Sequence, residues 1–234
     1  MLVPSRIADN LSRIQQQIAD AASRSGRAAS DVTLVAVTKY VTADMANELV
    51  EAGCLELGES RPQELWRKAK ELSNPDICWH FIGHLQRNKA KRSLPHISLL
   101  HSCDSNRLLA ELNRLAIGSG GKIDGLLEVN ISGDASKHGF QPDEMNAIVA
   151  GLPDLSHVRI RGLMSMASLG GDRDAARKDF ERLRQLRDQL ADHLPSGVSL
   201  SELSMGMSRD FEVAIEEGTT LVRVGSALFE GVDV

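Results

Sequence analysis

The sequence is poor in aromatic residues and in cysteine. Only 3% of its 234 residues are aromatic, and Tyr40 is the single tyrosine. The three cysteines, Cys54, Cys78 and Cys103, are odd in number, lie far apart and show no CxxC or Cys/His ligand spacing. This pattern argues against a disulfide framework and predicts no metal site. We therefore expect free thiols in a reducing cytoplasm.

The sequence also lacks a long apolar run and an excess of basic residues. No stretch approaches the roughly 20 apolar residues that a membrane span requires, and residues 1–10 contain no apolar signal-peptide core. The formal net charge of −5 argues against a nucleic-acid or membrane partner held by a general basic field. A local anion site is compatible with this charge.

What the sequence does contain is an alternation of short apolar runs with amphipathic segments. It opens with a helix over 5–25, which ends near Gly26. Strands are predicted at 32–38, 54–57, 77–82, 97–101, 123–130, 157–163, 199–203 and 220–224, and the helices between them at 43–52, 61–72, 86–93, 105–117, 142–150, 172–193 and 208–217. Four of these helices are followed by a glycine where a left-handed C-cap is expected: Gly53, Gly118, Gly151 and Gly218.

Eight strands in a chain of this length predict an α/β fold, a single-domain (β/α)8 barrel over residues 1–234 with an extra N-terminal helix. The alternative is an open doubly wound sheet, but the GxGxxG turn that usually marks it is absent after the first strand. No linker or low-complexity segment divides the chain. The barrel is therefore the favoured architecture.

The reactive groups of such a barrel lie at the C-terminal ends of its strands. The residues that follow the predicted strands are largely polar: Lys39, Glu59, Ser60, His84, Ser102, Asp104, Asn130, Met164, Ser165, Ser204, Arg223, Gly225 and Ser226. Lys39, at the end of "DVTLVAVTK", is the most informative. Partial desolvation at the rim would lower the pKa of its amine and favour attack on a carbonyl carbon. A lysine that merely extends from a strand end to solvent explains the position equally well.

Two stretches near the C-terminus predict a phosphate site. Ser204, Met205 and Gly206 precede a predicted helix, and Gly225 and Ser226 precede another short segment, so free backbone N–H groups and hydroxyls could surround an anion. A phosphate site after strands 7 and 8 is a recurrent feature of barrels.

Arg223 faces the same way as Gly225 on a strand. It either pairs with a carboxylate such as Glu202 or donates to a heteroatom of a ligand. An amine, a phosphate cradle and an arginine donor are together what pyridoxal phosphate (PLP) would need.

The motifs "LVAVTKY", "WHFIGHLQRNK", "HSCDS", "VNISGDASKHGF", "GLMSMA" and "LSMGMSRDFEVAIEEGTTLVRVGSALFEG" follow one another along nearly the whole chain. Together they resemble the pyridoxal phosphate homeostasis protein family. The resemblance implies a barrel similar to the N-terminal domain of alanine racemase, without a C-terminal β domain.

By this resemblance, Lys39 forms a Schiff base with PLP and Arg223 approaches the pyridine nitrogen. Residues assigned to the phosphate are Ser204 with its neighbours Met205 and Gly206, then Gly225 and Ser226. Three further positions match residues that line the cofactor, namely His84, Asn130 and Met164. The family usually reads "GEN" where this chain reads "GES", so the contact expected of that asparagine falls on Ser60.

An arginine at the pyridine nitrogen does not give up a proton, so it weakens the ring as an electron sink. Racemases with the same arginine use a tyrosine from the C-terminal domain as a second acid/base group. In a regular strand Tyr40 would point to the face opposite Lys39. The chain is therefore expected to carry or buffer PLP, without robust catalysis, in vitamin B6 and amino-acid homeostasis, and to hand PLP to apo-enzymes. The racemase dimer interface uses the C-terminal domain that the resemblance leaves out, so a monomer is expected.

Two alternatives remain open from the sequence. One is a small PLP-dependent racemase or decarboxylase with His84 or Cys103 as the second proton donor. The other is a Schiff-base aldolase that needs no cofactor. The glycine-rich segment 132–140 is either a mobile cover over the mouth or a surface turn, and its Lys137 is a candidate second contact for PLP.

Overall fold

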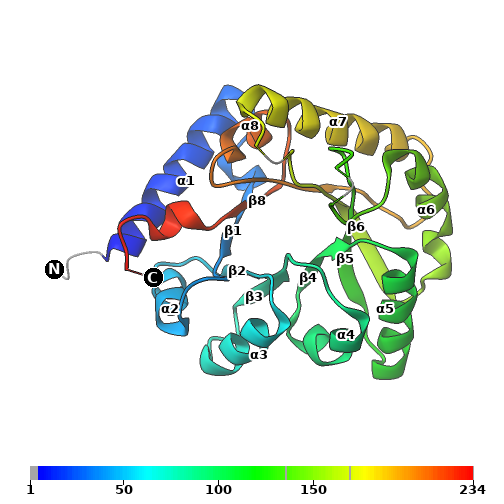
Figure 1. Ribbon diagram of the computed structural model, residues 1–234, viewed down its shortest axis with the longest axis horizontal. Helices are drawn as coiled ribbons and strands as arrows, with labels where there is room; N and C mark the ends of the chain where they lie inside the picture. The colour runs from blue at the N-terminus through cyan, green and yellow to red at the C-terminus, as the bar shows by residue number, and fades with distance from the viewer. Residues whose placement is uncertain (1–4, 135, 169, 234) are drawn as a thin grey trace.

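Eight parallel strands close into a barrel in the computed structural model, which describes residues 5–134, 136–168 and 170–233 (Figure 1). The strands pair in chain order, and β1 pairs with β8 to close the ring. Their bounds are β1 Thr33–Val37, β2 Glu56–Glu59, β3 Cys78–Phe81, β4 Leu99–Cys103, β5 Ile123–Glu128, β6 Val158–Met164, β7 Glu202–Met207 and β8 Leu221–Val224. The predicted (β/α)8 barrel is confirmed.

Helices connect successive strands and cover the outside of the barrel (Figure 1). The α-helices are α1 Arg6–Arg24, α2 Ala43–Glu51, α3 Pro62–Glu71, α4 Arg87–Ser93, α5 Asn106–Ser119, α6 Met145–Gly151, α7 Arg173–Ala191 and α8 Phe211–Glu216. Short 3-10 turns are η1 Ala29–Asp31, η2 Leu94–His96, η3 Pro142–Glu144, η4 Leu152–Asp154 and η5 Ser226–Phe229. Three helices, α1, α2 and α5, begin with an N-cap. The hydroxyls of Ser5, Thr42 and Ser105 accept hydrogen bonds from backbone N–H groups in the first turn of these helices.

Two of the predicted glycine caps are wrong. Gly118 lies inside α5, and the left-handed cap of that helix is Gly120, with a φ of 70°. Gly151 is the last residue of α6, with a φ of −83°, because a 3-10 turn continues directly from the helix. Gly53 and Gly218 do adopt positive φ, at 89° and 94°.

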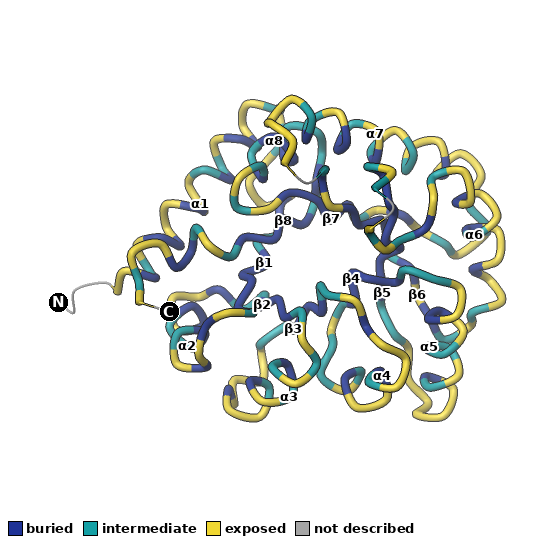
Figure 2. Tube along the Cα trace, in the orientation of Figure 1, coloured by how far each residue is buried: buried dark blue, intermediate teal, exposed yellow. Residues whose placement is uncertain are grey.

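The core has two parts. A large apolar layer fills the space between the strands and the surrounding helices. Inside the barrel the apolar cluster is small and consists of Val35, Leu126, Met164 and Leu221, with Leu99 packed against it. Figure 2 shows the strands buried and the outward faces of the helices exposed. Polar side chains therefore occupy much of the barrel interior.

The N-terminal helix is held against the end of the chain. Asn10 donates to the carbonyls of Leu228 and Glu230, and Arg13 forms an ion pair of 2.8 Å with Glu230. Figure 1 shows α1 and η5 side by side. None of the helices among the described residues is long and apolar enough to cross a membrane.

Candidate functional site

The C-terminal ends of β1 and β8 bring Lys39 to the residues that follow Arg223. Val35 lies opposite Arg223 in the parallel ladder, and a Cβ built on Gly225 would lie 3.3 Å from that of Val37. Lys39 follows two residues after Val37 and is half-buried. Lys39 and Gly225 therefore lie just beyond the ends of two adjacent strands.

The expected orientation of Tyr40 is wrong. The strand ends at Val37, and Lys39 and Tyr40 lie in a turn, so the alternation of a regular strand does not apply. The Nζ of Lys39 lies 4.9 Å from the centroid of the Tyr40 ring, in a cation–π contact, and the guanidinium of Arg61 lies 5.5 Å from the same centroid. Tyr40 itself is 67% exposed.

A second lysine, Lys68, supports this turn from behind. Its amine is fully buried and donates to the carbonyl of Thr38 at 2.5 Å and to Oε1 of Glu59 at 2.6 Å. The Thr38 hydroxyl donates to the same carboxylate oxygen at 2.7 Å. This pair has no recognisable spacing along the chain, because one partner lies on a helix and the other on a strand. Together these contacts fix the backbone one residue before Lys39.

The predicted phosphate residues of β7 lie lower in the barrel than expected. The strand extends to Met207, so Ser204, Met205 and Gly206 belong to it and do not form the turn before α8. Ser204 is fully buried and Met205 packs in the apolar layer outside the barrel. Gly206 has a φ of 88°, and an added Cβ would lie 2.5 Å from Cβ of Ala214, so it lets α8 pack closely.

Ser208 stands at the mouth in their place, and sequence reasoning missed it. Its Oγ accepts from the backbone N–H of Gly225 at 3.1 Å, which joins the end of β7 to the end of β8. Ser226 is exposed at the start of η5. Ser208, Gly225 and Ser226 thus form a small polar cradle.

Arg223 is fixed inside the barrel below this cradle. Its Nη2 donates to the carbonyl of Ser165 at 2.9 Å, and its Nη1 donates to Oγ of Ser204. Burial lowers its pKa to about 10, so the guanidinium stays charged near neutrality. Glu202 accepts from Thr220 instead, so a pair between Arg223 and Glu202 is wrong.

Glu128, at the end of β5, is an acid/base candidate that sequence reasoning missed. Burial and the charge of Asp104 raise its pKa to about 7, although Arg223 and His84 act in the opposite direction. A carboxyl group with this pKa exchanges protons near neutral pH.

His84 lies at the rim of the mouth, with Asp104 and His138. Its Nδ1 is 2.6 Å from Oδ2 of Asp104, and its ring stacks on that of His138 with centroids 4.2 Å apart and planes at 14°. One possible metal-ligand atom from each of these three side chains lies within 4.8 Å of the others. The stacked, nearly parallel imidazoles direct their ring-nitrogen lone pairs along parallel planes and not at one metal position. These contacts place His138 beside the loop that follows β3.

Lys137 connects Ser132 with the residues that follow β6. Its amine donates to the Ser132 hydroxyl at 3.0 Å and to the carbonyls of Met166 and Ala167 at 3.3 and 2.8 Å. A role as a second PLP contact stays a prediction.

The remaining predicted residues have packing or local roles in the structure. Asn130 donates to the carbonyl of Asp134 at 2.8 Å, within the turn after β5. Met164 belongs to the apolar cluster inside the barrel. Ser60 is half-buried after β2. Cys103 is fully buried, and burial raises the pKa of its thiol, which makes it a poor candidate for the proton donor.

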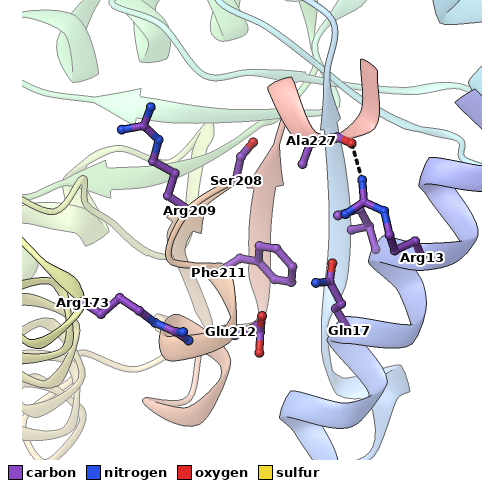
Figure 3. A pocket seen from close by; sticks show the side chains of 9 residues that line it. Arg13, Gln17, Arg173, Ser208, Arg209, Phe211, Glu212 and Ala227 are labelled. Atoms are coloured by element: carbon purple, nitrogen blue, oxygen red, sulfur yellow. Dashed lines mark hydrogen bonds between the residues drawn. The ribbon is translucent and has the colours of Figure 1, made fainter. Parts of the chain in front are cut away.

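A cavity of about 110 Å³ opens beside the cradle, between α1 and the residues that lead into α8 (Figure 3). Ser208 lines it, together with three arginines from separate elements: Arg13, Arg173 and Arg209. Arg13 pairs with Glu230, whereas Arg173 and Arg209 make no ion pair with another described residue. Glu212 also lines the cavity, but its carboxylate pairs with Arg24 at 2.9 Å. Arg173 and Arg209 therefore give the cavity a local positive charge, in a chain whose net charge is −5.

Comparison with known proteins gives consistent matches over nearly the whole chain. The family model described as the alanine racemase N-terminal domain matches residues 9–232. A protein of Aquifex aeolicus named pyridoxal phosphate homeostasis protein is 38% identical, over 94% of this chain and 96% of its own length. A protein of the same name from Pseudomonas aeruginosa is 37% identical, over 96% of this chain and 95% of its own length.

Solved structures show the same fold. PipY of Synechococcus elongatus with PLP bound superposes with a TM-score of 0.85 at 35% identity, covering 95% of this chain and 99% of that one. Alanine racemase from Corynebacterium glutamicum gives a TM-score of 0.73 at 13% identity, covering 97% of this chain and 63% of the racemase. The second likeness shows the barrel fold alone.

Proposed function

This chain belongs to the pyridoxal phosphate homeostasis protein family, and we propose that it binds PLP at the mouth of its barrel and carries or buffers it. Lys39 holds PLP through a Schiff base. The observation that supports this most directly is the placement of the Lys39 turn beside the strand end that carries Arg223 and the cradle.

The side chains at the mouth fit this group. The hydroxyls of Ser208 and Ser226 and the N–H groups of the adjoining backbone suit a phosphate. The Lys39 amine makes no ion pair with another described residue, so no carboxylate has to be displaced. Arg223 supplies a buried N–H donor for a ring nitrogen. His84, Asn130, Met164 and Ser60 remain proposed neighbours of the cofactor.

When bound, PLP supplies an electron-withdrawing ring for chemistry at an amino-acid carbon. Arg223 keeps its proton at neutral pH and therefore leaves the ring nitrogen without one. That weakens the ring as an electron sink and favours storage over turnover. We further propose a cytoplasmic monomer that passes PLP to apo-enzymes. The three free thiols suit a reducing compartment.

The test is covalent capture. Purified protein is mixed with PLP, reduced with borohydride and mapped by mass spectrometry. We expect one adduct, on Lys39, and its loss in Lys39→Ala, while Lys137→Ala keeps it. An adduct spread over surface lysines, or undiminished in Lys39→Ala, would contradict the proposal.

Glu128 gives specific support to a second candidate, a slow PLP-dependent racemase or decarboxylase. Its pKa of about 7 places a proton donor and acceptor at the mouth, the role that the sequence had assigned to His84 or Cys103. The discriminating measurement is exchange of the α-proton of L-alanine into deuterated buffer. Exchange near background supports the carrier, and fast exchange that Glu128→Gln abolishes supports the enzyme.

A further inference from the structure

A continuous line of hydrogen bonds runs through the barrel interior from Arg223 to its opposite end. Oγ of Ser204, which accepts from Arg223, lies 2.8 Å from Nδ1 of His101. Nε2 of His101 lies 2.7 Å from Nδ1 of His80. Nε2 of His80 lies 2.7 Å from Oε2 of Glu56. We call Glu56, His80, His101 and Ser204 the axial chain.

The axial chain links the two ends of the barrel. Glu56 is the first residue of β2, and the N-terminal ends of the strands form the face opposite the mouth. Its side chain is 36% exposed, whereas those of His80, His101 and Ser204 are buried. Arg223, the third residue of β8, lies toward the mouth.

The donor at one end favours one order of protons along the chain. A guanidinium only donates, so Ser204 accepts from it and has one O–H left to give. The partner of that O–H is Nδ1 of His101, which must then carry no proton. Neutral His101 therefore donates from Nε2.

The same reasoning extends to the far end of the chain. Nδ1 of His80 accepts from His101, so His80 donates from Nε2 to the Glu56 carboxylate. Each group gives one proton and receives one, and the chain ends on a negative charge. Desolvation, His80 and Arg223 together hold the pKa of His101 well below its ordinary range, in agreement with a neutral ring.

The reverse order of donors and acceptors along the axial chain is less favourable for two reasons. It needs either a protonated carboxyl on Glu56, although this side chain reaches solvent, or an imidazolium at the buried His80, directly beside a second histidine. It also points the Ser204 O–H away from His101, and no other acceptor for that proton is present among the described residues. A buried donor without a partner costs free energy.

We propose that the axial chain positions Arg223, so that Glu56 at the N-terminal end of the barrel and the buried guanidinium below the mouth stabilise each other through two neutral histidines. This inference adds four positioning residues to the PLP site and rests on the proposed function for its effect on PLP affinity. The order of the protons can be tested without PLP.

The first experiment is imidazole nitrogen NMR on the PLP-free protein. We expect His80 and His101 each to carry a proton on Nε2 and none on Nδ1, as the order of hydrogen bonds requires. Glu56→Gln should preserve both tautomers, because an amide oxygen still accepts from His80. A proton on Nδ1 of His101, or an imidazolium at either position, would overturn the proposal.

The second experiment measures the Kd for PLP in a matched pair of variants. His101→Leu leaves the Ser204 O–H without an acceptor, so we expect the Kd to rise about tenfold. His101→Gln offers both an acceptor and a donor and should stay within about threefold of the wild type. An equal loss of affinity in both variants, or none in His101→Leu, would contradict a positioning role. If the wild-type chain binds no PLP, the proposed function fails, and the NMR result still decides the order of the protons.

Discussion

Glu128 is the residue at which pH should act most directly. Its pKa of about 7 in the folded protein exceeds the ordinary value for glutamate, so the folded state takes up a proton more readily than the unfolded chain. The stabilisation by this proton is fully present below the ordinary glutamate pKa and is lost as pH rises through about 7.

Glu128→Gln should remove this dependence. The amide cannot ionise, so at pH 8 we expect the variant to be more stable than the wild type by up to about 3 kcal/mol. Urea unfolding at pH 5 and pH 8 measures the difference. Asp174→Asn, at an exposed position in α7, is the control and should leave the profile unchanged. An identical pH dependence in Glu128→Gln and wild type would show that this carboxyl group is not the cause.

Lys68 is the second residue with a large expected effect. Lys68→Met leaves the Glu59 carboxylate buried without its cation, and one of its oxygens, Oε2, already has no partner. We expect a loss of about 3–5 kcal/mol in the free energy of unfolding. Lys70→Met, on the exposed face of the same helix, should change it by less than about 0.5 kcal/mol. Similar losses in the two variants would mean that the buried pair contributes nothing specific.

At the scale of elements, the contact of β7 with α8 depends on one glycine. Gly206 combines a positive φ with a close approach to Ala214, and this contact decides where α8 packs against the end of β7. Because β7 leads directly to Ser208, a shift there would also move the cradle.

Gly206→Ala should therefore destabilise the protein more than the backbone conformation alone explains. Gly53 has nearly the same φ, 89° against 88°, but nothing lies within 4 Å of an added Cβ. We expect Gly53→Ala to cost about 1 kcal/mol and Gly206→Ala about 3 kcal/mol, measured by urea unfolding. Equal costs would show that α8 adjusts freely.

At the scale of the whole molecule, charge is distributed unevenly around the barrel. PLP is an anion and the chain carries a net charge of −5, so long-range electrostatics oppose its approach. Arg173 and Arg209, beside the cradle, offset this locally.

The association rate of PLP should respond to the position of a charge and not only to the net charge. Arg209→Gln should slow association about two- to fivefold at low salt, and the difference should shrink as salt increases. Lys122→Gln changes the net charge equally but lies directly before β5, at the end of the barrel opposite the mouth, and should have little effect. Stopped-flow absorbance gives both rates. Equal slowing by the two variants would contradict a local effect.

The sequence by itself determined the barrel, its helices and the family. The alternation of short apolar runs with amphipathic segments repeats a local rule eight times, and Lys39, Arg223 and Gly225 lie at strand ends that the pattern locates. The end of β7 was misplaced, because Ser204 and Gly206 have the composition of a turn, whereas pairing with β6 and β8 extends the strand through them.

Only the tertiary structure decided which polar side chains meet. Lys68 and Glu59 come from a helix and a strand, and the axial chain joins four strands, so neither shows a spacing in the sequence. The pKa of Glu128 likewise depends on burial and on Asp104, which lies on a different segment. Hydrogen bonds and ionisation depend on distances and dielectric surroundings in three dimensions, whereas secondary structure follows largely from neighbours along the chain.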